Sequence, residues 1–176
     1  MRRACGGFLL ALCLAGPLAA QASREYDLKA VFLFNFVTFV DWPANALPDK
    51  GPFVIGVLGD DPFGNALDEV VAGETIRGVP LQVRRCRTLE EARQCQILFI
   101  SASEAAKLPE ILKDLRGRPV LTVADLPRFP EVGGVIGFST GTRLQLLVNP
   151  TAAQRAGLVI SSKLLRVAKV VEEKSP

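Results

Sequence analysis

Histidine is absent from the 176-residue chain, and methionine, tryptophan and tyrosine occur once each. Without an imidazole, no Ser-His-Asp relay can be built. Gly137–Gly141 matches the G-x-S-x-G nucleophile pattern, but its predicted context is strand–turn–strand, whereas a nucleophile elbow requires a strand followed by a helix. We interpret this segment as a hairpin turn. A serine–lysine pairing stays open, although no motif indicates one, and we predict no catalytic residues.

Long apolar runs are scarce, and the main one stands at the N-terminus. Phe8–Leu18 is too short to span a membrane, and it follows two arginines. Ala20–Ala22 then matches the A-x-A pattern of a signal peptidase site. We therefore predict a cleaved signal peptide over residues 1–22, with cleavage after Ala20 as the alternative. Residues 23–176 are predicted to form one domain outside the cytoplasm.

Neither basic nor acidic residues dominate the predicted mature chain. Processing removes two of the 21 basic residues and none of the 18 acidic ones, which leaves a net charge of +1. This balance gives no electrostatic reason to expect nucleic acid or an acidic membrane as a partner. No second apolar run reaches membrane-spanning length, so we expect a soluble protein that does not insert directly into the membrane.

Only two cysteines, Cys86 and Cys95, lie outside the predicted signal peptide. In an oxidising compartment two such thiols most simply form one disulfide. A redox pair or a metal site is the alternative. The spacing is not that of a C-x-x-C motif, however, and no histidine is present to complete a zinc site. We predict no metal and no cofactor.

Apolar patterns and turn residues predict alternating helices and strands. Residues 53–58 are a continuous apolar run, which is typical of a strand covered on both faces, and residues 97–101 and 120–123 are predicted to form two further buried strands. Residues 135–139 and 143–148 flank a turn and predict a hairpin. The fold class is therefore an α/β single domain, with a mostly parallel central sheet flanked by helices and a probable antiparallel hairpin near the C-terminal half.

Local signals also place several helices. Arg24–Trp42 has a wide apolar arc and is predicted to form a helix that the rest of the domain largely buries. Asp61 is the expected N-cap of a helix that begins at Pro62 and runs to about Ala72. Thr88 opens a capping box for a short helix.

Ligands of doubly wound sheets bind at the carboxyl ends of the strands. Four polar residues follow the predicted buried strands and form a candidate ligand cleft: Asp60, Asp61, Ser101 and Asp125. Nearby glycines do not have the G-x-G-x-x-G spacing of a dinucleotide site.

With these elements placed, the order of motifs resembles the YfiR family of periplasmic proteins. The matching segments run through the predicted mature chain: Tyr26–Ala30, Phe34–Phe36, Val40–Pro43, Ile55–Gly64, Ile97–Ser101, Pro119–Asp125, Gly134–Phe138, Leu147–Asn149 and Ser161–Leu165.

The resemblance implies a non-enzymatic, dimeric regulator that binds the periplasmic sensor portion of an inner-membrane diguanylate cyclase and holds it inactive. Release would raise cyclic di-GMP and promote biofilm formation. Cys86 and Cys95 look like the family's cysteine pair. The family's partner surface lies in the C-terminal half, where our candidate face is Val135, Ile136, Phe138, Arg143, Leu144 and Leu146. The alternative is a small-molecule sensor module that acts with a histidine kinase or another membrane partner.

Overall fold

The computed structural model of the chain describes residues 16–47, 51–141 and 143–174. Within these residues eight strands form one mixed sheet in the order β10-β8-β7-β6-β5-β2-β4-β3, in which only β3–β4 and β7–β8 pair antiparallel. The strands are β2 (Phe53–Leu58), β3 (Thr75–Ile76), β4 (Val79–Cys86), β5 (Ile97–Ile100), β6 (Leu121–Ala124), β7 (Ile136–Thr140), β8 (Leu144–Val148) and β10 (Lys169–Val170). The predicted α/β domain with its parallel centre and antiparallel hairpin is confirmed.

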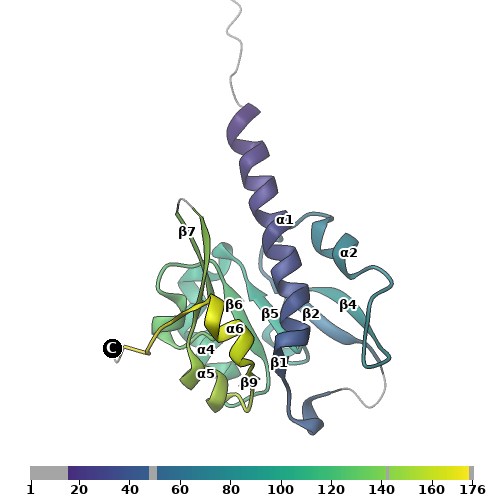
Figure 1. Cartoon of the computed structure of the whole chain (residues 1–176), viewed down its shortest axis with the longest axis vertical. Coiled ribbons are helices and arrows are strands. Elements are labelled where there is room, and N and C mark those ends of the chain that lie inside the picture. Colours follow the sequence, from purple (N-terminus) through teal and green to yellow (C-terminus); the bar gives the residue numbers. More distant parts are fainter. Residues whose placement is uncertain (1–15, 48–50, 142, 175–176) are drawn as a thin grey trace, which may run out of the picture.

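Helices cover both faces of this sheet (Figure 1). One face carries α1 (Gly16–Phe39), α2 (Ala66–Val71) and α6 (Ser162–Val167), and the other carries α3 (Leu89–Ala92) and α4 (Leu108–Leu115). Successive side chains of a strand point to opposite faces, so Ile55 packs with α1 while Val54 packs with α3 and α4. Every residue of β2 is therefore buried, which explains its continuous apolar run.

Capping residues set the ends of several helices. Thr88 Oγ1 accepts a hydrogen bond from the Glu91 backbone N–H at 3.2 Å, and the Glu91 carboxylate accepts one from the Thr88 N–H at 3.3 Å. The predicted capping box is thus confirmed. The helix predicted to begin at Pro62 instead begins at Ala66. Gly64 has a φ of +56°, a left-handed conformation that interrupts a right-handed helix, so the N-cap prediction for Asp61 is wrong.

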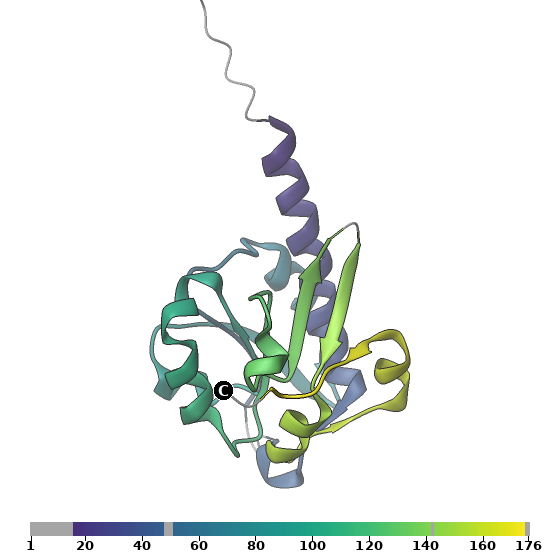
Figure 2. The same ribbon diagram turned by 90° about the vertical axis from the view of Figure 1, so that its left-hand side faces the viewer.

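Short elements complete the chain. The 3₁₀ helices are η1 (Ala44–Ala46), η2 (Ala102–Lys107) and η3 (Phe129–Val132), and α5 spans Pro150–Arg155. The predicted N-terminal helix ends at Phe39, since β1 (Val40–Asp41) pairs antiparallel with β9 (Val159–Ile160). The first half of α1 extends beyond the sheet, at the end of the domain where the β7–β8 hairpin also projects (Figures 1 and 2).

The predicted signal peptide lies largely outside this description. Residues 1–15 are not among the described residues, and the backbone of residues 16–22 belongs to α1. Cleavage after Ala22 therefore stays a prediction. In the ranges that the structure describes, no helix combines the length and the apolar character needed to cross a membrane.

Candidate functional site

A buried polar cluster joins α1 to the carboxyl end of the central strands. Asp125 directly follows β6, and one of its carboxylate oxygens accepts hydrogen bonds from the Tyr26 hydroxyl at 2.8 Å and the Lys29 ammonium at 2.7 Å. Both donors stand on α1, three residues apart, so they lie on one face of the helix. We call Glu25, Tyr26, Lys29 and Asp125 the α1 clamp.

Lys29 is the central residue of the α1 clamp. Its side chain is only 1% exposed, and Nζ lies 2.5 Å from the Glu25 carboxylate in addition to its contact with Asp125. The ammonium also lies 4.3 Å from the centre of the Tyr26 ring and 5.9 Å from that of Phe138. A buried charge requires such partners, and these two carboxylates and two rings supply them. The arrangement fixes α1 on the sheet.

Tyr26 connects the clamp to the aromatic core. Its ring meets Phe63 edge to face, with centroids 5.5 Å apart, and Phe63 meets Phe99 of β5 in the same way at 4.8 Å. Burial and donation to the Asp125 carboxylate raise the pKa of Tyr26 well above its ordinary range. The phenol therefore acts as a hydrogen-bond donor at neutral pH.

The four residues of the predicted ligand cleft do follow strand ends, but the carboxylates of Asp61 and Asp125 contact other residues of this chain. Asp61 accepts hydrogen bonds from the Phe63 N–H and from Arg85 Nε, each at 2.8 Å. Asp125 belongs to the α1 clamp. Ser101 is buried at the start of η2, and Asp60 is exposed. Ligand binding at these residues stays a prediction.

Arg85 organises the charges beside Asp61. Its guanidinium contacts the Asp61 carboxylate at 2.8 Å, the Asp68 carboxylate at 2.5 Å and the Gly64 carbonyl at 3.0 Å. Donation by Arg85 lowers the pKa of Asp68. These contacts hold the turn that leads from β2 into α2. They also show why acidic side chains follow this strand.

The cysteine pair lies on the opposite face of the sheet from α1. Cys86 ends β4, Cys95 precedes β5, and their Sγ atoms are 3.6 Å apart as free thiols in this structure. Gly56 of β2 makes room for them, because a Cβ there would lie 2.5 Å from Cys95 Sγ and 3.2 Å from Cys86 Sγ. The strand order thus brings together two thiols that the sequence separates by nine positions.

The two thiols differ in acidity. The hydrogen bond from Cys95, with a further contribution from the charge of Arg84, lowers the pKa of Cys86. The same thiol contact and burial raise the pKa of Cys95. Cys86 is therefore the thiol that ionises first. Within the described residues no group of three or more histidine, cysteine or carboxylate side chains could hold a metal ion.

Most of the predicted partner face is buried within the domain. Val135, Ile136, Phe138 and Leu146 belong to the core, whereas Arg143 is exposed and Leu144 is half-buried. Phe138 stacks on Phe36 of α1 with centroids 6.2 Å apart. The accessible part of this hairpin is consequently its tip. Its role in partner binding stays a prediction.

Sequence reasoning missed Tyr26, Lys29 and Glu25. A signal was present, because Lys29 and Glu25 lie outside the polar third of the helical wheel and interrupt its apolar arc. A charged residue on an otherwise buried face indicates a buried partner. The identity of that partner, 96 positions further along the chain from Lys29, required the fold.

Comparison with known proteins gives a family and a fold. The sequence profile described as YfiR/HmsC-like matches residues 26–169, whereas no curated protein matches the chain. A crystal structure of a conserved domain protein from Vibrio cholerae O1 biovar eltor str. N16961 has a TM-score of 0.53 at 12% identity, and the overlap covers 84% of this chain and 60% of that one. This similarity shows a shared fold alone.

A second solved structure is titled as the ABC domain in complex with L-Trp from Streptococcus pneumonia. It has a TM-score of 0.49 at 13% identity, and the overlap covers 67% of this chain and 55% of that one. The chain therefore spans 55% and 60% of the length of the two solved structures.

Proposed function

The chain belongs to the YfiR/HmsC-like family, and from that premise we propose that it is a non-enzymatic periplasmic repressor of an inner-membrane diguanylate cyclase. The observation that supports this proposal is the family match, which covers residues 26–169 and so nearly all of the predicted mature domain. The family is regulatory and non-catalytic, and its members act in cyclic di-GMP signalling from the periplasm.

The charged side chains that could act in catalysis contact other residues of the domain, which supports a binding role over a catalytic one. Lys29 contacts two carboxylates, Asp61 contacts Arg85, and Asp125 accepts two hydrogen bonds from α1. A general acid, base or nucleophile must instead reach a substrate atom. These contacts stabilise the domain. A partner is then bound by the surface of the domain.

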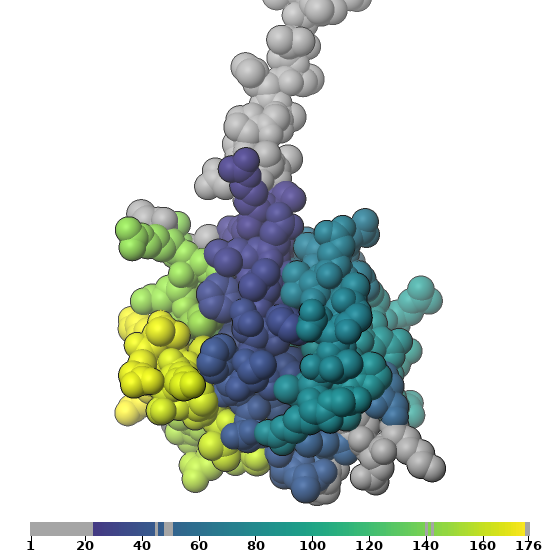
Figure 3. Space-filling model, turned by 45° about the vertical axis from the view of Figure 1, so that its right-hand side comes forward, coloured from purple at the N-terminus to yellow at the C-terminus, as the bar shows by residue number. Residues whose placement is uncertain are grey.

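One end of the domain is suited to that contact. The hairpin tip with Arg143 projects from the body beside α1 (Figures 1 and 2), of which residues 23–39 remain after the predicted cleavage. From residue 23 onward, the outer side of α1 is open between the α2–β4 region and α6 (Figure 3). It presents Leu28 and Val31 as exposed apolar side chains. We assign the cyclase contact to this projecting end, with the hairpin tip as its first element.

A disulfide between Cys86 and Cys95 is part of the proposal. Export would place these neighbouring thiols in an oxidising compartment. Closure of so short a loop contributes about 2–3 kcal/mol to stability in the chain-entropy model. We propose the bond as a structural tie between β4 and the start of β5, and a homodimer as the assembled form.

Deletion of the gene tests the repressor proposal. We expect cellular cyclic di-GMP and surface attachment to rise several-fold in the deletion strain. The full chain should restore both values, and a version without residues 2–22 should not, because it stays on the wrong side of the membrane. An unchanged cyclic di-GMP level, or rescue by the version without the leader, would contradict the proposal.

Photo-crosslinking then tests the surface. A photoreactive residue at Arg143, in the hairpin tip, is compared with one at Glu69, which is exposed on α2 away from the hairpin. Membrane adducts of a cyclase with a periplasmic domain should form at Arg143 and not at Glu69. The reverse pattern would overturn the assignment of the surface. Recovery of a histidine kinase would instead favour the alternative of a sensor module that works with a kinase.

A further inference from the structure

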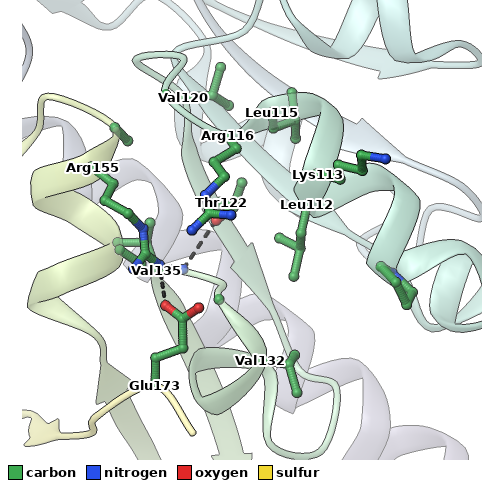
Figure 4. A pocket seen from close by; sticks show the side chains of 15 residues that line it. Leu112, Lys113, Leu115, Arg116, Val120, Thr122, Val132, Val135, Arg155 and Glu173 are labelled. Atoms are coloured by element: carbon green, nitrogen blue, oxygen red, sulfur yellow. Dashed lines mark hydrogen bonds and ion pairs between the residues drawn. The ribbon is translucent and has the colours of Figure 1, made fainter. Parts of the chain in front are cut away.

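A cavity of about 260 Å³ lies between α4 and α5, away from the α1 clamp and the cysteine pair. The start of β6, the η3–β7 connection and the C-terminal segment complete its wall (Figure 4). The family resemblance implies no ligand for this cavity, and none of the four residues of the predicted ligand cleft lines it. Its volume lies just below the range of drug-sized pockets and fits a compound of about ten non-hydrogen atoms.

The wall of this cavity has apolar and cationic parts. Leu112, Leu115 and Val132 provide apolar surface, while Lys113, Arg116 and Arg155 provide positive charge against the single carboxylate of Glu173. The lining therefore has a net charge of +2. Figure 4 shows the side chains of Arg116, which directly follows α4, and of Arg155, the last residue of α5, directed into the cavity from opposite sides. Such a lining favours a ligand with an apolar body and one anionic group.

Arg155 already binds a carboxylate of this chain. Its guanidinium forms an ion pair with Glu173, which follows β10 near the end of the described residues. Guanidinium groups bind carboxylates through two parallel hydrogen bonds. Across the cavity, Arg116 forms no side-chain ion pair with any described residue. The Arg155 guanidinium is thus paired with the Glu173 carboxylate, and the Arg116 guanidinium faces the cavity beside this pair.

The C-terminal segment does not depend on Glu173 for its position. On one side of Glu173, the Val171 N–H donates to the Val148 carbonyl at 2.8 Å. On the other, the Lys174 N–H donates to the Glu131 carbonyl at 3.0 Å, and the Lys174 ammonium lies 3.0 Å from the Glu131 carboxylate. A second carboxylate can therefore replace Glu173 at Arg155 while the segment stays in place.

From this geometry we propose that the cavity binds a small amphipathic carboxylate. The ligand carboxylate lies between Arg116 and Arg155, and its apolar body contacts Leu112, Leu115 and Val132. Glu173 competes for Arg155 and so weakens binding. An ammonium group is disfavoured here, because the ligand would meet three cationic side chains. This inference goes beyond the proposed repressor function and needs no membrane partner.

Calorimetric titration of the purified exported protein with octanoate tests the proposal, and neutral octanamide is the matched probe. We expect saturable binding of octanoate with a Kd on the order of 10 µM to 1 mM, and binding of octanamide at least tenfold weaker. Glu173→Gln should bind octanoate at least threefold more tightly than the wild type. Arg116→Gln should bind it at least tenfold more weakly.

Arg118→Gln is the matched control, because its guanidinium donates to the Asp114 carbonyl and does not line the cavity. It should bind octanoate within twofold of the wild type. Amide chemical shifts of Thr122 and Val135, which line the cavity and share a hydrogen bond, should move on titration and so locate the site. The proposal is overturned if octanoate binds neither the wild type nor Glu173→Gln, if octanamide binds equally well, or if Arg116→Gln changes nothing. Failure of this titration would leave the cyclic di-GMP result unaffected.

Discussion

Replacement of Lys29 by methionine keeps a long side chain in the core but removes the ammonium group between Glu25 and Asp125. The Asp125 side chain is 10% exposed, so its carboxylate would lose a partner without gaining much water. Breaking a buried ion pair costs about 3–5 kcal/mol. Asp125 keeps the Tyr26 hydroxyl, and Glu25 is 28% exposed. We therefore expect a loss of about 2–4 kcal/mol.

Urea unfolding monitored by the fluorescence of Trp42 measures this change, and a thermal melt provides a second value. For a domain of about 150 residues, the expected loss lowers Tm by roughly 5–15 °C. The matched control is Lys107→Met, because Lys107 also pairs with a carboxylate but its side chain is 67% exposed. That variant should stay within about 0.5 kcal/mol of the wild type.

A double-mutant cycle separates the charge from general packing damage. In the Asp125→Asn background the neutral amide oxygen still accepts the Tyr26 hydroxyl, and no unpaired carboxylate is left. Lys29→Met should therefore cost at least about 1 kcal/mol less there than in the wild type. The reasoning is refuted if Lys29→Met alone costs under about 1 kcal/mol, or if the two substitutions are additive.

Gly56→Ala should lower the free energy of unfolding by about 1–3 kcal/mol, since the new Cβ would lie 2.5 Å from Cys95 Sγ. Thiol titration of the exported variant should also find more free cysteine than in the wild type. Urea titrations at several pH values should show that the wild type is more stable than Tyr26→Phe, with the full difference below pH 10 and a smaller one above it. The reason is that folding raises the pKa of Tyr26 from 10.0. A stability difference that is independent of pH would contradict this. Asn149→Ala should lower the free energy of unfolding by about 2–3 kcal/mol in the same assay. The buried Asn149 side chain caps α5 and donates to the Pro130 carbonyl. A loss below about 1 kcal/mol would argue against that cap.

Local signals in the sequence predicted local structure well. The capping box at Thr88 and the buried strand at Phe53–Leu58 follow from hydrogen bonding and hydropathy over a few neighbouring residues. The error at Asp61 has a local cause, the left-handed Gly64, and a distant one. Its carboxylate accepts from the Phe63 N–H in a turn and is held by Arg85 of β4, and no nearby residue indicates that partner.

The candidate sites depended on longer distances. The paired cysteines could be expected from their number and the predicted compartment, but the role of Gly56 between them required the strand order. The α1 clamp joins residues almost one hundred positions apart. The cavity beside Arg155 needs a C-terminal segment that hydropathy does not mark as structured. Contacts of this range are decided by topology, which a residue pattern constrains only weakly.

The α1 clamp has a consequence for how an exported chain acquires its structure. Under the proposed export, translocation delivers α1 first, yet Asp125 follows about one hundred residues later and the β9 partner of Val40 later still. Until then the apolar face of α1, with Leu33 and Phe36, has no sheet to cover it. Contacts between such distant residues form slowly, and an uncovered apolar helix invites aggregation. We therefore expect the emerging N-terminus to need periplasmic chaperones, and the domain to be complete only when nearly the entire chain has crossed the membrane.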